Sequence, residues 1–353
     1  MRDSHTPLSS VERALSFKTT FTRAGPAAVT DSVVFHTIGP RLYALDRHDG
    51  TVRWKTTIGT WGGEPPILVD DVLYVGWSGG VRAIDATSGT ISWTYDGAPS
   101  YGPLGYHEGT VVANKNGERG TGEILGLNGG SEAWQYETEA GILSGVTVVD
   151  GVAYVGTKGQ RVSSNEPPDA PHVQAVFAVS ASDGSEKWVF RGVSGRVSVP
   201  AVTERRVYLS CSDDYVYALD TETGEREWRT SVPLTSFSAP TVVDGRVYVG
   251  STDGHVYVLD ADSGTIEYRV SVGASVHRGL AVAAGPNPDA ESETERQTLV
   301  YAGTASGTLT VIKTELQEVV SEIDLGAPPA GPPSVYGGTI HIGDDDGNAR
   351  ILN

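Results

Sequence analysis

The chain of 353 residues is strongly acidic, with 44 Asp and Glu against 26 Lys and Arg and a formal net charge of -18. Such a field repels phosphate backbones and anionic lipid, which argues against nucleic acid and membrane surfaces as partners. The 44 Gly and 19 Pro are too many for a helical protein, and no stretch approaches the ~20 apolar residues of a membrane span. The excess of carboxylates with few lysines indicates a halophilic protein, whose net charge is screened by salt.

Residues 1–12 are predicted to be a polar N-terminal tail, and residues 13–353 a single domain. The tail has no apolar stretch like that of a secretory signal, which predicts a cytoplasmic protein. A leader removed from a longer precursor would instead place the protein outside the cytoplasm. The strand-like stretch at residues 13–22 belongs to no complete repeat.

A repeat of about 40 residues fills the rest of the chain. Turn glycines recur at this period, and each is followed four residues later by an aromatic side chain. The pairs are Gly50 with Trp54, Gly89 with Trp93, Gly130 with Trp134, Gly184 with Trp188, Gly224 with Trp228 and Gly264 with Tyr268. We interpret these Trp residues as packing groups between neighbouring repeats.

Each repeat predicts four antiparallel strands, which residues 238–268 show most clearly. Residues 241–243, 246–250, 255–260 and 265–270 carry strand patterns, and turn pairs such as Asp244-Gly245 and Asp253-Gly254 separate them. One such unit cannot bury both faces, whereas units stacked around an axis can, so the fold class is an all-β propeller of four-stranded blades. Helical periodicity is absent.

Eight second strands can be counted, which predicts eight blades. They end at His36, Gly76, Asn114, Gly156, Ser210, Gly250, Gly303 and Gly343. The last copy stops after its third strand, so residues 13–22 are predicted to supply the missing fourth strand, with Phe17 or Ala14 in the place of the repeated Trp. Copy seven lacks the Trp and carries an acidic insertion at residues 285–297, so its docking is expected to be the weakest.

The block DGxVYVGSxDGxVYALDxxTGxxxW, seen best at residues 198–228 and 238–268, resembles the PQQ-type (pyrroloquinoline quinone) propeller repeat. Such propellers occur in BamB-like outer-membrane-assembly lipoproteins and in quinoprotein alcohol dehydrogenases. The resemblance implies one of two functions. The first is a non-catalytic scaffold that binds a protein or peptide partner. The alternative is a quinone- or sugar-binding protein or oxidoreductase that uses the propeller mouth.

Residue content favours the scaffold over the enzyme. The resemblance implies that a quinoprotein would hold PQQ over Ca²⁺ beside an adjacent cysteine pair, but Cys211 is the only cysteine. We interpret Cys211 as a buried apolar residue and residues 344–348, DDDGN, as a hairpin turn rather than a calcium loop. The sequence therefore predicts no catalytic residues, no metal site and no cofactor.

The segments that join successive blades are predicted to line one mouth of the central channel. Aromatic and Arg side chains on such loops suit a binding surface, although they can equally be rim residues that cover the core. The predicted partner is a protein or peptide, bound by a monomer. The candidate binding residues are Trp61, Glu64, Trp77, Tyr101, Arg196, Phe237, His277 and Arg278.

Overall fold

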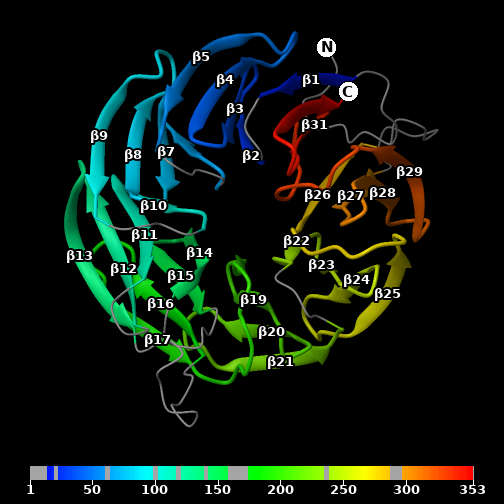
Figure 1. Cartoon of the computed structure of the whole chain (residues 1–353). Coiled ribbons are helices and arrows are strands. Elements are labelled where there is room, and N and C mark those ends of the chain that lie inside the picture. Colours follow the sequence, from blue (N-terminus) through cyan, green and yellow to red (C-terminus); the bar gives the residue numbers. More distant parts are fainter. Residues whose placement is uncertain are drawn as a thin grey trace, which may run out of the picture. The chain divides into compact units, whose positions relative to one another are not determined.

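The structure is a computed structural model that describes residues 14–19, 23–59, 64–97, 102–116, 121–138, 142–157, 174–233, 238–286 and 296–352. Within these ranges the elements are the strands β1 to β32, with no helix (Figure 1). The strands form eight four-stranded antiparallel sheets. These sheets are the blades of an eight-bladed β-propeller, which confirms the predicted fold class. Among the described residues there is consequently no helix that could cross a membrane.

The chain forms two compact units, and unit 1 comprises Met1–Thr57, Trp61–Pro65 and Ser238–Asn353. It contains blades 1, 6, 7 and 8. Blade 1 consists of β2 (Ala24–Val29), β3 (Val33–Ile38), β4 (Arg41–Asp46) and β5 (Val52–Thr57). Blade 6 consists of β22 (Thr241–Val243), β23 (Arg246–Gly250), β24 (His255–Asp260) and β25 (Ile266–Ser271). Blade 7 consists of β26 (Leu280–Pro286), β27 (Arg296–Gly303), β28 (Thr308–Lys313) and β29 (Glu318–Asp324). Blade 8 consists of β30 (Ser334–Tyr336), β31 (Thr339–Gly343), β32 (Asn348–Leu352) and β1 (Ala14–Lys18).

Unit 2 comprises Ile58–Thr60 and Pro66–Phe237 and contains blades 2 to 5. Blade 2 consists of β6 (Ile67–Val69), β7 (Val72–Trp77), β8 (Gly80–Asp85) and β9 (Ile91–Asp96). Blade 3 consists of β10 (Gly105–His107), β11 (Thr110–Asn116), β12 (Gly122–Asn128) and β13 (Ser131–Thr138). Blade 4 consists of β14 (Ile142–Val149), β15 (Val152–Thr157), β16 (Val176–Ser180) and β17 (Glu186–Phe190). Blade 5 consists of β18 (Ala201–Val202), β19 (Arg206–Cys211), β20 (Tyr215–Asp220) and β21 (Arg226–Ser231).

Within unit 2 the repeated Trp residues of blades 2, 3 and 4 each pack onto the blade that follows. The side chain of Trp188 is 7% exposed, and its Nε1 donates a hydrogen bond to the Thr221 carbonyl of blade 5 at 2.9 Å. Its ring covers Gly224, which has a φ of 72° and where an added Cβ would lie 2.5 Å from the ring. Glycine is therefore required twice over, by its backbone conformation and by the approaching indole. Trp134 repeats the arrangement with the Ala181 carbonyl, at 3.1 Å.

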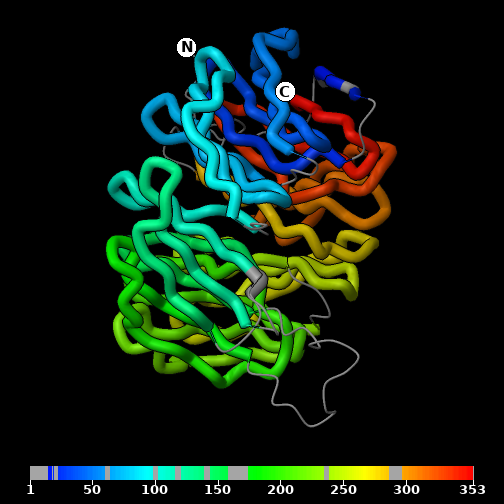
Figure 2. Tube along the Cα trace, turned by 60° about the vertical axis from the view of Figure 1, so that its left-hand side comes forward, coloured from blue at the N-terminus to red at the C-terminus, as the bar shows by residue number. Residues whose placement is uncertain are grey.

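The N-terminal strand completes the last blade, as predicted. β1 pairs with β32 in antiparallel register, and Phe17 lies opposite Ala349. In blade 5, Trp228 lies opposite Ala218, which pairs with Tyr208. The corresponding pair in blade 8 is Ile351 with His341, and Leu15 lies opposite Ile351. Leu15 therefore occupies the position of the repeated Trp, and both predicted registers, with Phe17 or with Ala14 there, are wrong. In both views the blue N-terminal strand lies beside the red C-terminal strands (Figure 2).

The predicted alignment of blade 1 with the repeat is wrong by one residue. The second strand of blade 1 was expected to end at His36, in the position of Gly250. β3 instead continues to Ile38, and its register with β4 places Thr37 at that position. The sequence of blade 1 has no glycine there to fix the alignment, so the repeat pattern alone could not resolve it.

Leu15 fills its place less completely than the repeated Trp residues fill theirs. A pocket of about 60 Å³ remains beside it, lined also by Phe17, Leu45 and Gly50. We expect Leu15→Trp to fill this space and to stabilise the protein by about 1 kcal/mol, since unfilled volume costs ~24 cal/mol per Å³. Urea unfolding measures the change. Leu15→Ala is the control and should be destabilising; a lower stability for Leu15→Trp would contradict the assignment of this position.

Candidate functional site

Each blade has two ends, at which different segments meet. At the linker end the chain passes to the next blade, and the turn between the second and third strands lies there too. At the turn end lie the turn between the first and second strands and the turn between the third and fourth strands. The predicted binding residues that the structure describes all belong to the linker end.

In unit 1 the structure brings two of the predicted residues together with an acidic turn. His277 and Arg278 lie between β25 and β26, and both are half-buried. The Arg278 guanidinium lies 3.8 Å from the Asp345 carboxylate in the turn between β31 and β32. Burial lowers the pKa of His277, and Arg278 lowers it further while Asp345 opposes the shift. Glu64 contributes its carbonyl, which accepts a hydrogen bond from the Thr37 hydroxyl at 3.1 Å.

In unit 2 the predicted residue Trp77 is held by its neighbours rather than projecting freely. Its ring lies against the backbone of Gly59 and Gly79, where added Cβ atoms would approach it to 2.0 and 2.2 Å. The Arg82 guanidinium lies over the ring at 4.8 Å. Arg196 is exposed, and its backbone N–H donates to the Ser212 hydroxyl at 2.8 Å. The predicted residues Trp61, Tyr101 and Phe237 lie outside the described residues.

The aspartate-rich segment 344–348 is a hairpin turn whose first carboxylate is fully engaged. Asp344 is 1% exposed and accepts hydrogen bonds from the backbone N–H groups of Asp346 and Asn348 and from the Asn348 side chain. The Arg350 guanidinium lies 3.4 Å away. The carboxylate oxygens of Asp344 thus form the turn, in agreement with the interpretation of the sequence. No group of three or more His, Cys, Asp or Glu in the described ranges could hold a metal ion.

The chain lacks one feature that the resemblance to quinoprotein dehydrogenases implies. Such enzymes have an adjacent cysteine pair beside the quinone, whereas this chain has a single cysteine. Cys211 is fully buried in β19, as predicted, and burial raises the pKa of its thiol to about 12. A thiol of this kind is unreactive at neutral pH.

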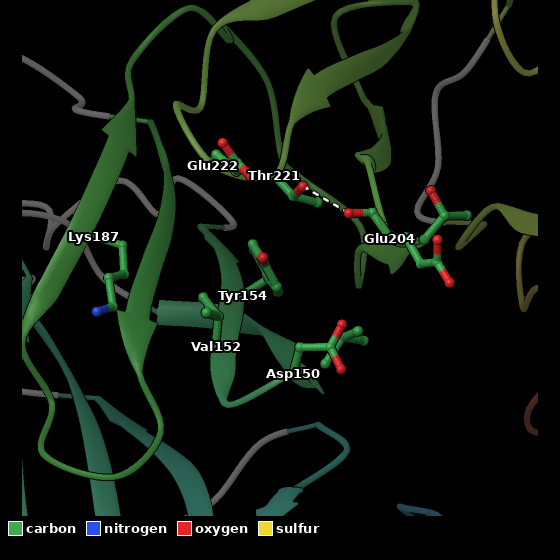
Figure 3. A pocket seen from close by; sticks show the side chains of 9 residues that line it. Asp150, Val152, Tyr154, Lys187, Glu204, Thr221 and Glu222 are labelled. Carbon is green, nitrogen blue, oxygen red and sulfur yellow. Dashed lines mark hydrogen bonds between the residues drawn. The ribbon is translucent and has the colours of Figure 1, made fainter.

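A pocket of about 360 Å³ lies at the turn end of unit 2, between blades 4 and 5 (Figure 3). Three carboxylates line it, each from a different hairpin turn. Asp150 lies between β14 and β15, Glu204 between β18 and β19, and Glu222 between β20 and β21. None of the three has an ion-pair or side-chain hydrogen-bond partner among the residues that the structure describes.

Local geometry explains why these side chains meet. Asp150 and Gly151 have φ angles of 48° and 74°, as a tight two-residue hairpin turn requires, and Asp tolerates this conformation. In blade 5, Thr221 ties the two turns together. Its N–H donates to the Arg205 carbonyl at 3.1 Å, and its hydroxyl donates to the Glu204 carbonyl at 3.1 Å.

Tyr154 and Lys187 complete the polar lining of the pocket. Tyr154 is only 3% exposed and its ring packs against Trp188 at 5.8 Å. Its hydroxyl has no hydrogen-bond partner among the described residues. Burial raises the pKa of Tyr154 to about 12, with smaller effects of Asp150 and Asp220. The Lys187 ammonium lies at the edge of the group, away from the carboxylates (Figure 3).

The pocket offers a cation three carboxylates and a buried hydroxyl. Among the described residues its lining includes no His, Ser or Cys. Sequence reasoning missed this site because it looked for a binding surface only on the segments that join successive blades. The available signal was that Asp150 and Glu204 hold the same turn position in two successive repeats, with Glu222 in a second turn of the later one.

The comparisons with known proteins agree with this architecture. A family model described as "Outer membrane protein assembly factor BamB" matches residues 6–121, 78–196 and 172–332. A sequence search of curated proteins found no match. Among solved structures, the chain is similar to BamB from Moraxella catarrhalis, with 16% identity, a TM-score of 0.72, and coverage of 98% of this chain and 99% of that one.

A second similar structure is the computationally designed Ika8 protein, with 16% identity and a TM-score of 0.76. The match covers 95% of this chain and 97% of the designed one. At such identities the solved structures establish the fold alone. The family model spans most of the chain, and the chain therefore belongs to the PQQ-repeat family described as outer membrane protein assembly factor BamB.

Proposed function

We propose that this propeller is a non-catalytic scaffold that binds a protein or peptide partner. Family membership supports a scaffold, since the family is described as an assembly factor. The observation that carries the proposal is the pocket between blades 4 and 5. It presents three carboxylates and a buried hydroxyl whose side chains have no hydrogen-bond or ion-pair partners among the residues that the structure describes. Such preformed polar groups on a rigid frame favour recognition over chemistry.

Cross-linking in the native source tests this proposal. The tagged chain is expected to cross-link to one or a few specific proteins, each enriched over a tag-only control and over an unrelated acidic protein of similar net charge. The second control is needed because a chain of net charge -18 attracts basic proteins without specificity. Recovery of the same proteins by the acidic control, or of none, would count against the scaffold.

The enzymatic alternative has a separate test. Because the chain lacks the cysteine pair of quinoproteins, titration with PQQ and Ca²⁺ is expected to leave the quinone absorbance unchanged. Dye-linked oxidation of alcohols and sugars should likewise stay at the level of the buffer control. A saturable spectral change together with turnover would replace the scaffold by an oxidoreductase.

A further inference from the structure

An arginine of unit 1 occupies the position that corresponds to Thr221 in the pocket. Arg47 directly follows Asp46 at the end of β4, as Thr221 follows Asp220 at the end of β20. The N–H of Arg47 donates to the Ser32 carbonyl at 3.0 Å, just as that of Thr221 donates to Arg205 at 3.1 Å. The two residues are therefore equivalent in their blades. Each lies at the turn end, in the crevice beside the preceding blade.

Arg47 fills its crevice with a guanidinium group. Its Nη2 donates to the carbonyls of Tyr336 and Gly337, each at 2.8 Å, and to the Thr339 hydroxyl at 3.1 Å. Its Nη1 donates to the Asp31 carbonyl at 3.4 Å, and the guanidinium lies over the Tyr336 ring at 5.2 Å. All of these contacts lie between blades 8 and 1 within unit 1. The hairpin turns of this fold can thus form a complete guanidinium site.

The walls of the two crevices correspond residue by residue. Tyr336 pairs with Thr339 across the turn of blade 8, as Val149 pairs with Val152 in blade 4. The three residues that Arg47 contacts in blade 8 are thereby equivalent to Val149, Asp150 and Val152, and all three line the pocket. Asp31 in blade 1 corresponds in the same way to Glu204 in blade 5.

Two differences open the second crevice and change its charge. Thr221 is much shorter than arginine, so the volume that the Arg47 side chain fills in unit 1 stays open in unit 2 and forms part of the pocket. Asp150 stands in place of Gly337, and Glu222 adds a further carboxylate from the turn after β20. These two added carboxylates favour a bound cation that comes from outside the chain.

We infer that the pocket between blades 4 and 5 binds a guanidinium group from outside the chain, namely an arginine side chain of the protein partner. This inference rests on the proposed scaffold function. The carbonyls of the turn between β14 and β15 and the carboxylates of Asp150 and Glu204 offer acceptors to the planar fork of N–H donors. The Tyr154 hydroxyl at the buried side of the pocket is a further acceptor. Lysine has only a compact ammonium and matches these spread acceptors less well.

The test uses acetyl-arginine-N-methylamide as the probe, with its citrulline and lysine counterparts for comparison. Citrulline keeps the shape but lacks the charge. Binding is measured by NMR titration at one fixed, high salt concentration, so that the long-range attraction of the acidic chain is screened. We expect the arginine probe to bind at least tenfold more tightly than the citrulline probe and more tightly than the lysine probe.

Three variants locate the binding. Thr221→Arg reproduces the arrangement of Arg47. It is expected to fill the pocket and to lower the affinity for the arginine probe at least tenfold. Asp150→Asn removes one carboxylate and keeps a residue that tolerates the turn conformation, so it gives a second measurement if Thr221→Arg does not fold. Asp244→Asn is the matched control, because Asp244 has a φ of 49° in the equivalent turn of blade 6, outside the pocket. It should bind the probe as the wild type does.

Equal binding of the probe by wild type, Thr221→Arg and Asp150→Asn would overturn the inference, as would the absence of saturable binding to the wild type. The cross-linking experiment separates this from the scaffold proposal. If a specific partner is captured equally by wild type and Thr221→Arg, the scaffold stands and the arginine pocket falls. If the probe binds as expected but no partner is captured, the pocket is a guanidinium site, but the scaffold proposal is wrong.

Discussion

Replacing Trp188 by Ala is expected to lower the free energy of unfolding by about 3–5 kcal/mol, the usual loss for a large buried aromatic side chain. The indole of Trp188 packs in one apolar cluster with Tyr154 of its own blade and with Val207 and Leu209 of blade 5. Its removal opens a cavity between the blades and also leaves the Thr221 carbonyl without its donor. Urea unfolding followed by far-ultraviolet circular dichroism measures the loss.

Ser321 provides the matched control for this substitution. It lies opposite Val311 in blade 7, at the position that Trp188 holds in blade 4. Because a serine there makes no comparable contact between blades, Ser321→Ala should change the stability by less than about 0.5 kcal/mol. A loss below about 1 kcal/mol for Trp188→Ala would contradict the packing role assigned to the repeated Trp residues.

Acidification is the second change with a large expected effect, because two histidines are buried between blades 8 and 1. His36 and His341 are both 0% exposed. His36 Nδ1 lies 3.0 Å from the Gly25 carbonyl, and His341 Nε2 lies 2.7 Å from the Thr339 hydroxyl. The other ring nitrogen of each has no partner among the described residues. Protonation would therefore bury a charge and an N–H group without an acceptor.

Burial lowers the pKa of His36 to about 4 and that of His341 to about 3, from 6.5 in the unfolded chain. For His341, His36 and Arg47 lower the pKa further. Below pH 6.5 the unfolded chain then binds more protons than the folded one, so stability is full above this pH and falls as the pH decreases toward 4. We expect a loss on the order of 3 kcal/mol from each imidazole, measured by urea unfolding at successive pH values.

The repeats of the chain supply the control variants. His341 occupies the position of Tyr208 and Tyr248, and His36 that of Val249. The double variant His36→Val with His341→Tyr should lose the decline between pH 6.5 and 4.5. The loss of stability that remains in acid should begin at a lower pH, because hydrogen bonds hold the pKa of turn carboxylates such as that of Asp85 below the usual 3.8. An unchanged pH profile in the double variant would place the acid sensitivity elsewhere.

The fold was predictable because each blade repeats the residues that determine it. Glycines such as Gly224 provide a positive φ, and the Trp of the preceding blade, here Trp188, packs over them. Both residues therefore recur in most repeats, at the period that defines the blades. The closing strand could be located as a stretch left over from the repeats. Its register could not, because this strand has no Trp to mark it, and only the pairing of Leu15 with Ile351 shows that Leu15, rather than Phe17 or Ala14, holds the Trp position.

The candidate site was predictable only in part. The blade linkers could be identified, but whether a linker side chain projects or packs depends on its neighbours, as Trp77 shows by lying between Gly59 and Gly79. The acidic pocket joins residues as far apart in sequence as Asp150 and Glu222, and it has Thr221 at the position where blade 1 has Arg47. Such a pocket is visible in the sequence only after the blades have been aligned turn by turn.

The pairing of β1 with β32 is tested most directly by a disulfide between Ser16→Cys and Arg350→Cys, two positions that lie opposite each other. The native Cys211 is fully buried and does not compete. Oxidation of the folded protein is expected to give a monomer in which mass spectrometry finds residues 16 and 350 joined within one chain, while neither single variant forms the link. A link between two chains, or no link in the folded protein, would show that the N-terminal strand does not complete the last blade.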